Sequence, residues 1–364
     1  MRTLIVEKDK LEENTRKLKE HTTAQTKIIA VVKCNGYGLG AVEITKCLIE
    51  NGIEMFAVST VEEALELRNA GIENDILMLS CTAIKEDIES LLDNSIILSV
   101  GSNEDIQIIE KIAEERNIQV RVHLKIDTGM GRYGFVSSKK GNIVDELKSI
   151  KNIKIEGTFS HFSNSYSNEK YTKLQFKRFL EMVNLLRNNN IETGMLHICN
   201  SAAFIKYPEM HLDAVRIGSA FLGRISCANE LNLKSVGYLE TKVTEIKELE
   251  KGSYISYSNA YKTKKKTKVA IVPCGYTEGF NLTVDNDMFR EIDKIRNISS
   301  ATKDLFKKEK IIIRIAEEDC EVLGRVGTHH VVCDITNKNI KIEDNVMMGI
   351  NPKYVDTSVK REYR

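Results

Sequence analysis

The sequence lacks the features that identify membrane and secreted proteins. No run of apolar residues approaches the ~20 that a membrane-spanning helix needs. The N-terminal segment has no apolar core of the kind found in a secretory signal peptide. We therefore expect a protein that has no membrane partner and is located in the cytoplasm.

The chain also lacks an excess of charge of either sign, with 53 basic and 52 acidic residues. A net charge of +1 argues against a nucleic acid or another polyanion as the main partner. One basic run, KTKKKTK at 262–268, has no aromatic residues among its lysines. This composition favours a solvated loop over a nucleic-acid site.

Paired cysteines are absent as well. The eight cysteines are scattered along the chain without a C-x-x-C pair, so no spacing typical of a zinc or redox site occurs. In a reducing compartment such residues behave as small hydrophobic side chains. We therefore predict no metal site.

What the sequence does contain is typical of a folded protein with two domains. Hydrophobic residues make up 42% of the chain and charged residues 29%, which is ordinary for a globular protein. The length of 364 residues exceeds that of one average domain. An α/β barrel followed by a smaller domain fits this length.

From residue 28 onward, short apolar runs alternate with polar turns and amphipathic stretches. Eight such repeats predict parallel strands joined by helical crossovers, which close into a (β/α)8 TIM-type barrel. The predicted strands are 28–32, 55–59, 76–80, 96–100, 120–126, 155–161, 196–199 and 214–217. The clearest predicted helices are 61–70, 84–92, 104–116 and 170–187.

After about residue 230 the helical pattern stops, and strand-like runs predict a mainly β domain. A charged, helix-like insert at 287–310 interrupts it. The predicted strands are 236–246, 252–258, 268–275, 311–316, 321–326, 331–335 and 346–350. The fold class is therefore α/β plus all-β, with a barrel domain at 1–230 and a C-terminal β domain at 231–364.

The segment KIIAVVKCNGYGLG (27–40) contains the most distinctive loop of the chain. A buried apolar strand ends in Lys33, and a glycine-rich loop with Tyr37 follows. Low polarity around the ammonium would lower its pKa and make Lys33 a nucleophilic amine. A strand-end lysine that simply reaches solvent is the commoner alternative, but Tyr37 inside the loop favours a functional role.

Polar residues also follow other predicted barrel strands. In a barrel of this type, functional side chains come from the C-terminal ends of the strands. The residues at these ends are Lys33, Arg132, His161, Asn200, Ser201 and Arg216. We therefore expect one polar site at that mouth of the barrel.

Seven segments, in this order, resemble the motifs of the alanine racemases, a family of enzymes that use pyridoxal 5'-phosphate (PLP). They are VVKCNGYGLG (31–40), KIDTGMGRYGF (125–135), FSHFSNS (159–165), HICNSAA (197–203), AVRIGSAFLG (214–223), ISYSNAY (255–261) and PCGYTEGF (273–280). The resemblance implies a barrel plus a β domain, a two-fold homodimer, and a racemase that supplies D-alanine for cell-wall peptidoglycan.

The resemblance also implies which residues bind the cofactor. Lys33 would hold PLP covalently, Arg132 would bind its phenolic oxygen and the substrate carboxylate, and Arg216 would face the pyridine nitrogen, held in place by His197. The other implied cofactor-binding residues are Tyr37, His161, Asn200, Ser201, Gly218, Ser219 and Tyr354. Ser201 would bond the phosphate and cap a short helix, although an ordinary helix cap is its plainer interpretation.

Catalysis, by the same resemblance, needs two bases on opposite faces of the substrate. Lys33 would act on the D-enantiomer and Tyr257 of the partner subunit on the L-enantiomer. Tyr276 would narrow the substrate entrance, and the backbone N–H of Thr328 would bind the substrate carboxylate.

The sequence departs from the family pattern in the second domain. Thr328 and His329 stand where the family has Met-Asp, and Pro352 stands where it has a phosphate-binding tyrosine, so Tyr354 is the candidate substitute. These changes alter the pocket and leave serine or lysine open as alternative substrates to alanine.

Other activities and one modification also stay open. A PLP-dependent decarboxylase shares the domain order, and a non-catalytic PLP carrier is a further alternative, although Arg216 and Tyr257 favour racemisation. Lys125 corresponds to a lysine that is carbamylated in many family members. A plain salt bridge from Lys125 to Asp127 or another acid is the alternative.

Overall fold

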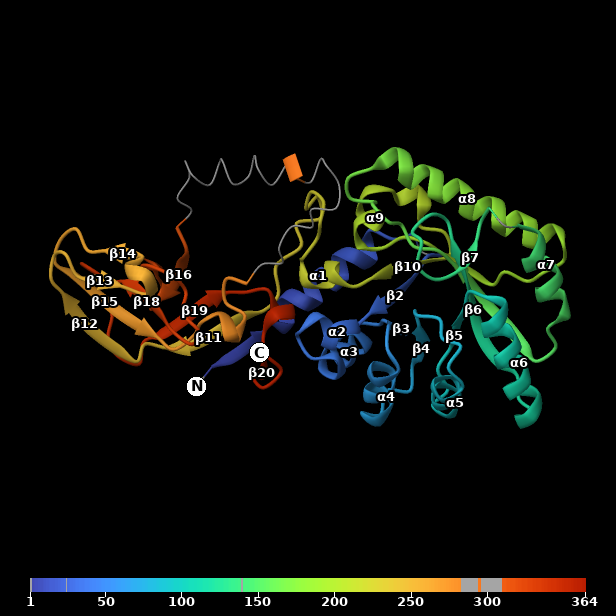
Figure 1. Ribbon diagram of the computed structural model, residues 1–364, viewed down its shortest axis with the longest axis horizontal. Coiled ribbons are helices and arrows are strands. Elements are labelled where there is room, and N and C mark those ends of the chain that lie inside the picture. Colours follow the sequence, from blue (N-terminus) through green and yellow to red (C-terminus); the bar gives the residue numbers. More distant parts are fainter. Residues whose placement is uncertain (1, 24, 139, 283–293, 296–309) are drawn as a thin grey trace. The chain divides into compact units, whose positions relative to one another are not determined.

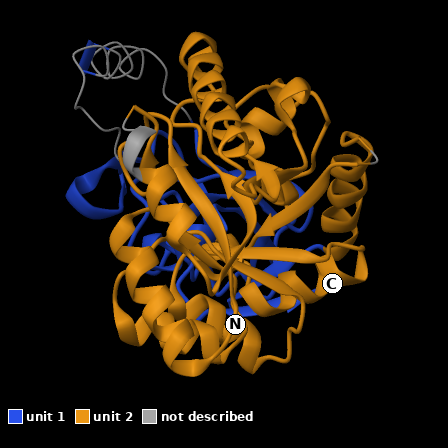
Figure 2. Ribbon diagram, turned by 90° about the vertical axis from the view of Figure 1, so that its right-hand side faces the viewer, with its two compact units in different colours: residues 1–7, 237–364 blue, residues 8–236 orange. Residues whose placement is uncertain are grey.

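The computed structural model describes residues 2–23, 25–138, 140–282, 294–295 and 310–364, which form two compact units (Figure 2). One unit comprises residues 8–236, and the other comprises residues 1–7 and 237–364. The first seven residues, which the sequence analysis assigned to the barrel, therefore belong to the unit formed by the C-terminal residues. The charged insert expected at 287–310 lies almost entirely outside the described residues.

Eight parallel strands of the larger unit form the expected barrel, in the order β4-β3-β2-β10-β9-β8-β6-β5 (Figure 1). Residues Leu77 and Ile97 pair to bring the two end strands together, so the barrel is nearly closed. The strands are β2 (Lys27–Val31), β3 (Met55–Val58), β4 (Asp75–Met78), β5 (Leu98–Val100), β6 (Val120–Asp127), β8 (Ile153–Phe159), β9 (Met195–His197) and β10 (Ala214–Ile217); a short strand, β7 (Phe135–Val136), pairs with β6. The predicted barrel is confirmed, and its strand ends differ from the expected ones by no more than about two residues.

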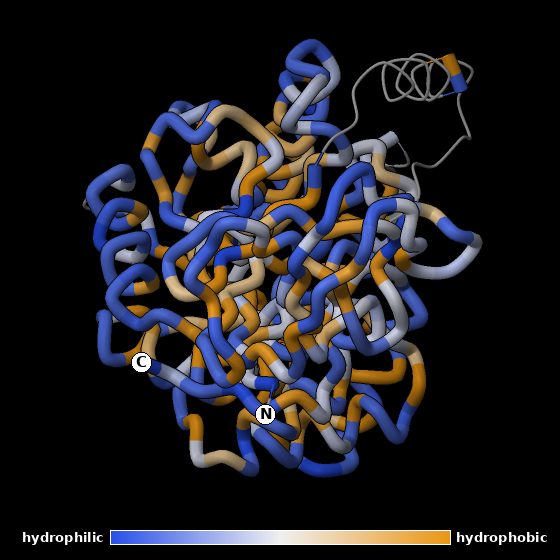
Figure 3. Tube along the Cα trace, turned by 90° about the vertical axis from the view of Figure 1, so that its left-hand side faces the viewer, coloured by the Kyte–Doolittle hydropathy of each residue, from blue (hydrophilic) through white to orange (hydrophobic). Residues whose placement is uncertain are grey.

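Helices connect these strands and surround them (Figures 1 and 2). They are α1 (Lys8–Glu20), α2 (Lys33–Tyr37), α3 (Ala41–Glu50), α4 (Val61–Asn69), α5 (Lys85–Asp93), α6 (Asn103–Arg116), α7 (Lys140–Ser149), α8 (Glu169–Asn188) and α9 (Ser201–Lys206). Hydrophobic and hydrophilic residues alternate along the trace, as Figure 3 shows, which lets each helix bury one face. Among the helices that the structure describes, none is long and apolar enough to cross a membrane.

Local sequence signals explain where several helices begin. Thr60 and Glu63 form a reciprocal capping box at the start of α4, and Ser102 and Asp105 form another at the start of α6. Inside the barrel, apolar side chains from several strands pack into one core cluster, because these strands are buried on both faces. The cluster comprises Ile29, Val31, Met55, Ala57, Leu77, Ile97 and Ala214.

The smaller unit consists mainly of strands in three sheets. A six-stranded sheet has the order β17-β16-β19-β11-β1-β20, a three-stranded sheet has the order β12-β15-β18, and β13 pairs with β14. The strands are β1 (Thr3–Val6), β11 (Tyr238–Lys242), β12 (Glu245–Leu249), β13 (Tyr254–Ile255), β14 (Tyr261–Lys262), β15 (Thr267–Val272), β16 (Ile312–Ile315), β17 (Glu318–Glu321), β18 (Val331–Asp334), β19 (Asn345–Gly349) and β20 (Lys360–Tyr363). The prediction of a mainly β domain is therefore confirmed.

Three of its predicted strands are wrong in detail. The strand expected at 236–246 is split into β11 and β12, which join different sheets. The run 252–258 contains only the two residues of β13 before a 3-10 turn begins at Tyr257. The run expected at 321–326 overlaps β17 by one residue only, because β17 pairs in register with β16 before the chain turns away.

The N-terminal strand should be important for the stability of the smaller unit. Leu4 on β1 is fully buried, and β1 lies between β11 and β20. We expect Leu4→Ala to lower the free energy of unfolding by roughly 2–5 kcal/mol, because it removes buried methyl groups and leaves a cavity. Ile312→Ala, at a residue 47% exposed on the same sheet, is the control and should cost much less. Denaturant unfolding measures both; equal losses would contradict the role of β1.

Candidate active site

Lys33 lies two residues after the last residue of β2 and begins a turn of unusual backbone conformation. The next three residues have positive φ angles of 54°, 52° and 59°, at Cys34, Asn35 and Gly36. Non-glycine residues in this left-handed region cost about 1 kcal/mol or more each, so surrounding contacts must stabilise the turn. The side-chain oxygen of Asn35 accepts a hydrogen bond from the backbone N–H of Ala41 at 2.9 Å. Cys34 is exposed, so the expectation that the cysteines act as small hydrophobic residues is wrong for it.

Tyr37 brings the loop after β2 against the loop after β10. A Cβ atom on Gly218 would lie 2.2 Å from the Tyr37 hydroxyl, so only glycine leaves room for the ring. Burial raises the pKa of the Tyr37 hydroxyl above its usual range and keeps it protonated. Ser201 Oγ accepts hydrogen bonds from the N–H groups of Gly218 (3.2 Å) and Ala220 (3.4 Å). Hydroxyl and backbone N–H groups therefore gather in one corner of the barrel mouth, with Ser219 in the same loop.

Asn200 caps the short helix α9. Its side-chain oxygen accepts hydrogen bonds from the N–H of Ala203 (3.0 Å) and from Ser165 Oγ (2.9 Å). The predicted capping role of Ser201 is therefore wrong, because Asn200 occupies the cap position and Ser201 is the first residue of the helix. This arrangement leaves the Ser201 hydroxyl directed at the loop after β10.

Arg216 is buried near the end of β10, with 3% of its surface exposed. Its Nη1 lies 2.7 Å from His197 Nδ1, and its Nη2 donates to the Ser160 carbonyl at 2.6 Å and lies 3.3 Å from His161 Nδ1. Burial lowers the pKa of Arg216 to about 10, so the guanidinium stays charged at neutral pH. Burial, followed by the charge of Arg216, holds the pKa of His197 and His161 well below the ordinary value. Both imidazoles are therefore neutral and able to accept hydrogen bonds.

Arg132 lies exposed in the loop after β6. Together with Lys125, Tyr133 and His161 it lines a narrow crevice of about 10 Å³. The structure thus places these residues side by side, in the same unit as Lys33 and Arg216.

Lys125 is 5% exposed and donates a hydrogen bond from Nζ to the Leu79 carbonyl at 2.7 Å. Nζ also lies 4.9 Å from the centre of the Phe159 ring. Burial lowers the pKa of Lys125 to about 8. The alternative of a salt bridge to Asp127 is wrong, because the Asp127 carboxylate accepts instead from the backbone N–H groups of residues 129–131.

In the smaller unit, Tyr276 and Thr328 come together. Their hydroxyl groups lie 2.9 Å apart. Tyr257 is 73% exposed at the start of the 3-10 turn η3 (Tyr257–Asn259), and Tyr354 ends η5 (Pro352–Tyr354). The predicted site residues therefore fall into two groups, one at the barrel mouth and one in the smaller unit.

Sequence reasoning missed two well-connected residues. Glu278 is buried and forms an ion pair with Arg2. Its carboxylate also accepts a hydrogen bond from the Gly275 N–H (2.8 Å) and lies 2.9 Å from His329 Nδ1. These contacts support the loops that contain Tyr276 and Thr328. His123 lies on β6 with its Nδ1 2.8 Å from His197 Nε2. The signal that could have pointed to His123 was its position, as a histidine in the middle of an apolar strand.

The fold and these side chains define a two-domain barrel enzyme with its polar site at the C-terminal ends of the strands. Residues 6–225 match the family model for the N-terminal domain of alanine racemase, and residues 236–360 match the model for its C-terminal domain. The chain therefore belongs to the alanine racemase family, and it is an isomerase.

Individual relatives agree with this assignment. The chain is 36% identical over 354 residues to the alanine racemase of Clostridium tetani, which covers 95% of this chain and 85% of the relative. It is 36% identical over 282 residues to that of Methanococcus maripaludis, with 76% and 75% covered. The solved alanine racemase of Clostridium difficile has a TM-score of 0.85 at 28% identity, and the match covers 100% of this chain and 95% of that one.

The lowered pKa of Lys125 predicts a dependence of stability on pH. Between about pH 8 and 10.5 the folded state has lost the Lys125 proton while the unfolded state still holds it, so stability rises with pH across this window. Relative to Lys125→Met, we expect wild-type stability to gain roughly 2–3 kcal/mol over this range. Denaturant unfolding at several pH values measures the difference. The exposed Lys111→Met is the control, and an equal gain in wild type and Lys125→Met would contradict the prediction.

Proposed function

We propose that this enzyme is a PLP-dependent alanine racemase that interconverts L- and D-alanine with two bases. The names of its relatives support alanine as the substrate. The observation that supports the chemistry most directly is the buried, charged Arg216. It lies on β10, which pairs with β2, the strand that leads into Lys33.

The residues at the barrel mouth fit PLP in three respects. The aldehyde of PLP needs an amine to bind covalently, and Lys33 follows β2 at the barrel mouth. A phosphate needs hydrogen-bond donors, and the Ser201 hydroxyl and the backbone of the 218–220 loop lie together beside Tyr37. An unprotonated ring nitrogen needs a donor that keeps its own proton, and Arg216 is such a donor.

PLP, when bound, withdraws electrons from the substrate Cα and so makes its proton acidic. Arg216 would donate a hydrogen bond to the ring nitrogen without releasing a proton, which would limit the electron withdrawal and thereby side reactions. His197 and the ring of Phe159, whose centre is 5.1 Å from the guanidinium carbon, hold Arg216 in place. Arg132 would bind the substrate carboxylate through its two-pronged donor group.

Two groups would move the proton at Cα. Lys33 would serve the D-enantiomer and Tyr257 of the partner subunit the L-enantiomer, one on each face. The 73% exposure of Tyr257 supports this, because an exposed phenol is available to a second subunit. The Tyr276–Thr328 hydroxyl pair would border the substrate entrance.

This division of the bases implies a two-fold homodimer, since each site needs a tyrosine from the other chain. We further propose that the enzyme acts in the cytoplasm and that its product, D-alanine, is used to build peptidoglycan. Tyr354 would complete the phosphate site in place of the family tyrosine.

Purified protein supplied with PLP should convert L-alanine to D-alanine, measured by chiral chromatography. Lys33→Ala should abolish the reaction, because it removes both the cofactor amine and one base. Lys27→Ala, an exposed lysine at the other end of β2, is the control and should leave the rate unchanged. Faster turnover of L-serine or L-lysine would retain the mechanism and change the substrate. Release of CO2 without a D-product would favour a decarboxylase instead, and PLP binding with neither product would favour a carrier.

A mixture of two inactive variants tests the shared site. Lys33→Ala and Tyr257→Phe should each be inactive alone, but one site of each mixed dimer has both intact bases. Random subunit exchange should therefore restore about a quarter of wild-type activity. Tyr254→Phe, at a residue 54% exposed in the same unit, is the control and should be active by itself. No recovery after verified exchange would contradict a tyrosine shared between subunits.

A further inference from the structure

Three buried side chains form a continuous hydrogen-bonded row inside the barrel. Arg216 Nη1 lies 2.7 Å from His197 Nδ1, and His197 Nε2 lies 2.8 Å from His123 Nδ1. The exposed fractions of Arg216, His197 and His123 are 3%, 0% and 1%. The proposed function uses Arg216 and its contact with His197 but gives no role to His123.

The packing around the row fixes the orientation of both rings. A Cβ atom on Gly157 would lie 2.5 Å from His123 Nδ1, so the glycine makes room for the imidazole against β8. The Phe159 ring stacks on His197, with centres 4.9 Å apart and an angle of 4° between the planes. Neither imidazole can therefore rotate without displacing its neighbours.

The donors and acceptors along this row can be arranged in only one direction. A guanidinium has donors only, so His197 Nδ1 must accept. A neutral imidazole whose Nδ1 accepts has its proton on Nε2, and His197 therefore donates to His123 Nδ1. His123 must in turn have its proton on its own Nε2. The tautomers of both histidines thus follow from the charge of Arg216.

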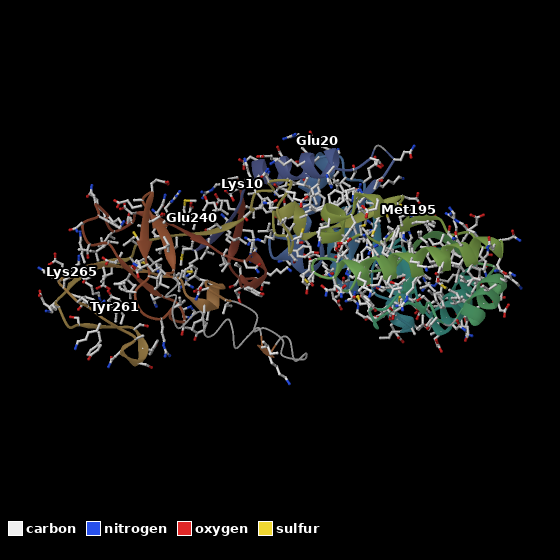
Figure 4. All side chains as sticks on the ribbon, turned by 90° about the horizontal axis from the view of Figure 1, so that it is seen from above. Lys10, Glu20, Met195, Glu240, Tyr261 and Lys265 are labelled. Atoms are coloured by element: carbon white, nitrogen blue, oxygen red, sulfur yellow. The ribbon has the colours of Figure 1, made fainter. Side chains whose placement is uncertain are left out.

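The far end of the row reaches the opposite end of the barrel. His123 lines a cavity of about 790 Å³ at the N-terminal ends of the strands, as does Met195, which Figure 4 labels. Arg121 lies in the same cavity and binds Asp75 with two hydrogen bonds of 2.8 Å and Glu156 with one of 2.7 Å.

His123 is neutral at neutral pH. Burial is the main cause that lowers its pKa, to about 4. Glu156 and Asp75 act in the opposite direction, while Arg216 and Arg121 add to the lowering. Its Nδ1 is therefore available to accept from His197 throughout the neutral range.

We propose that His123 is a positioning residue for the racemase reaction: by accepting a hydrogen bond from His197 Nε2–H, it holds the His197 ring in the orientation that presents Nδ1 to Arg216. Because Arg216 has donors only, the His197 proton stays on Nε2 whichever residue occupies position 123. Without an acceptor there, this N–H is buried and unpaired, so the ring shifts towards another acceptor and the guanidinium loses the contact that orients it. The consequence for catalysis rests on the proposed function, whereas the hydrogen bond from His197 to His123 does not depend on it.

Two substitutions separate this role from simple filling of the core. His123→Leu keeps an apolar volume but removes the acceptor. His123→Asn is smaller but retains an amide oxygen near the original Nδ1 position. A purely structural role predicts that the smaller Asn is at least as damaging, and a positioning role predicts that Asn rescues. His211→Leu is the matched control, because His211 is also buried and stacked on a phenylalanine, and its Nε2 lies 2.8 Å from the Phe204 carbonyl oxygen, outside the row.

The first measurement is the hydrogen bond of His197 Nε2–H in the protein without cofactor. Spectra of 15N-histidine-labelled protein show which ring nitrogen holds the proton, and the chemical shift of that proton shows whether it is hydrogen-bonded; the signals of the seven histidines are assigned by removing the others one at a time. We expect the Nε2–H form in every variant, with a hydrogen-bonded N–H in wild type, His123→Asn and His211→Leu and a marked upfield shift of the N–H proton in His123→Leu. An unchanged His197 N–H signal in a folded His123→Leu protein would overturn the proposal.

The second measurement is the kinetics with PLP and alanine. We expect kcat of His123→Leu to fall roughly 10–100-fold while KM changes much less, because under the proposed function Arg216 would face the cofactor and not the substrate. His123→Asn should recover most of kcat. Equal losses in the two variants would also overturn the proposal. If wild type itself forms no D-alanine, the proposed function fails, and the histidine spectra still decide the role of His123 in orienting His197 and Arg216.

Discussion

The burial of a permanent charge at Arg216 is the constraint on which the barrel mouth depends. An ion removed from water costs several kcal/mol unless its hydrogen bonds are replaced. The guanidinium binds the carbonyl oxygens of Ser160, His197 and Ile198 as well as the His197 ring. Because these acceptors come from β8 and β9 and the residues that follow them, neighbouring strands must be in register for the charge to be satisfied. The site and the stability of the barrel are therefore not independent.

The same region stores backbone strain close to Lys33. Consecutive left-handed residues are unfavourable, and they persist because the turn is held on several sides. Tyr37, at the end of this turn, lies directly against Gly218, so the loops after β2 and β10 support each other. Lys33, which follows β2, and the buried guanidinium on β10 are thereby held near the ends of adjacent strands.

Sequence reasoning succeeded where the signal is local. The barrel follows from the alternation of apolar runs and amphipathic stretches, and its strands fall close to their predicted positions. It succeeded less well in the smaller unit. The pairing of β1 with β20 joins residues near opposite ends of the chain, and its pairing with β11 is also between segments far apart in the sequence, which no local pattern reveals. The break between β11 and β12 is likewise decided by which sheet each half joins.

The sequence by itself determined the family, because ordered motifs place particular residue types at the ends of predicted strands. Only the tertiary structure decided which of these side chains touch. The contact between His123 and His197 spans 74 residues of sequence, and it depends on strand register and on the direction of each side chain within the barrel. Asn200, not Ser201, caps α9 for a similar reason, since the backbone conformation at each position decides which side chain meets the free N–H groups. Residue types are written in the chain, whereas hydrogen bonds between distant side chains exist only after the strands have aligned.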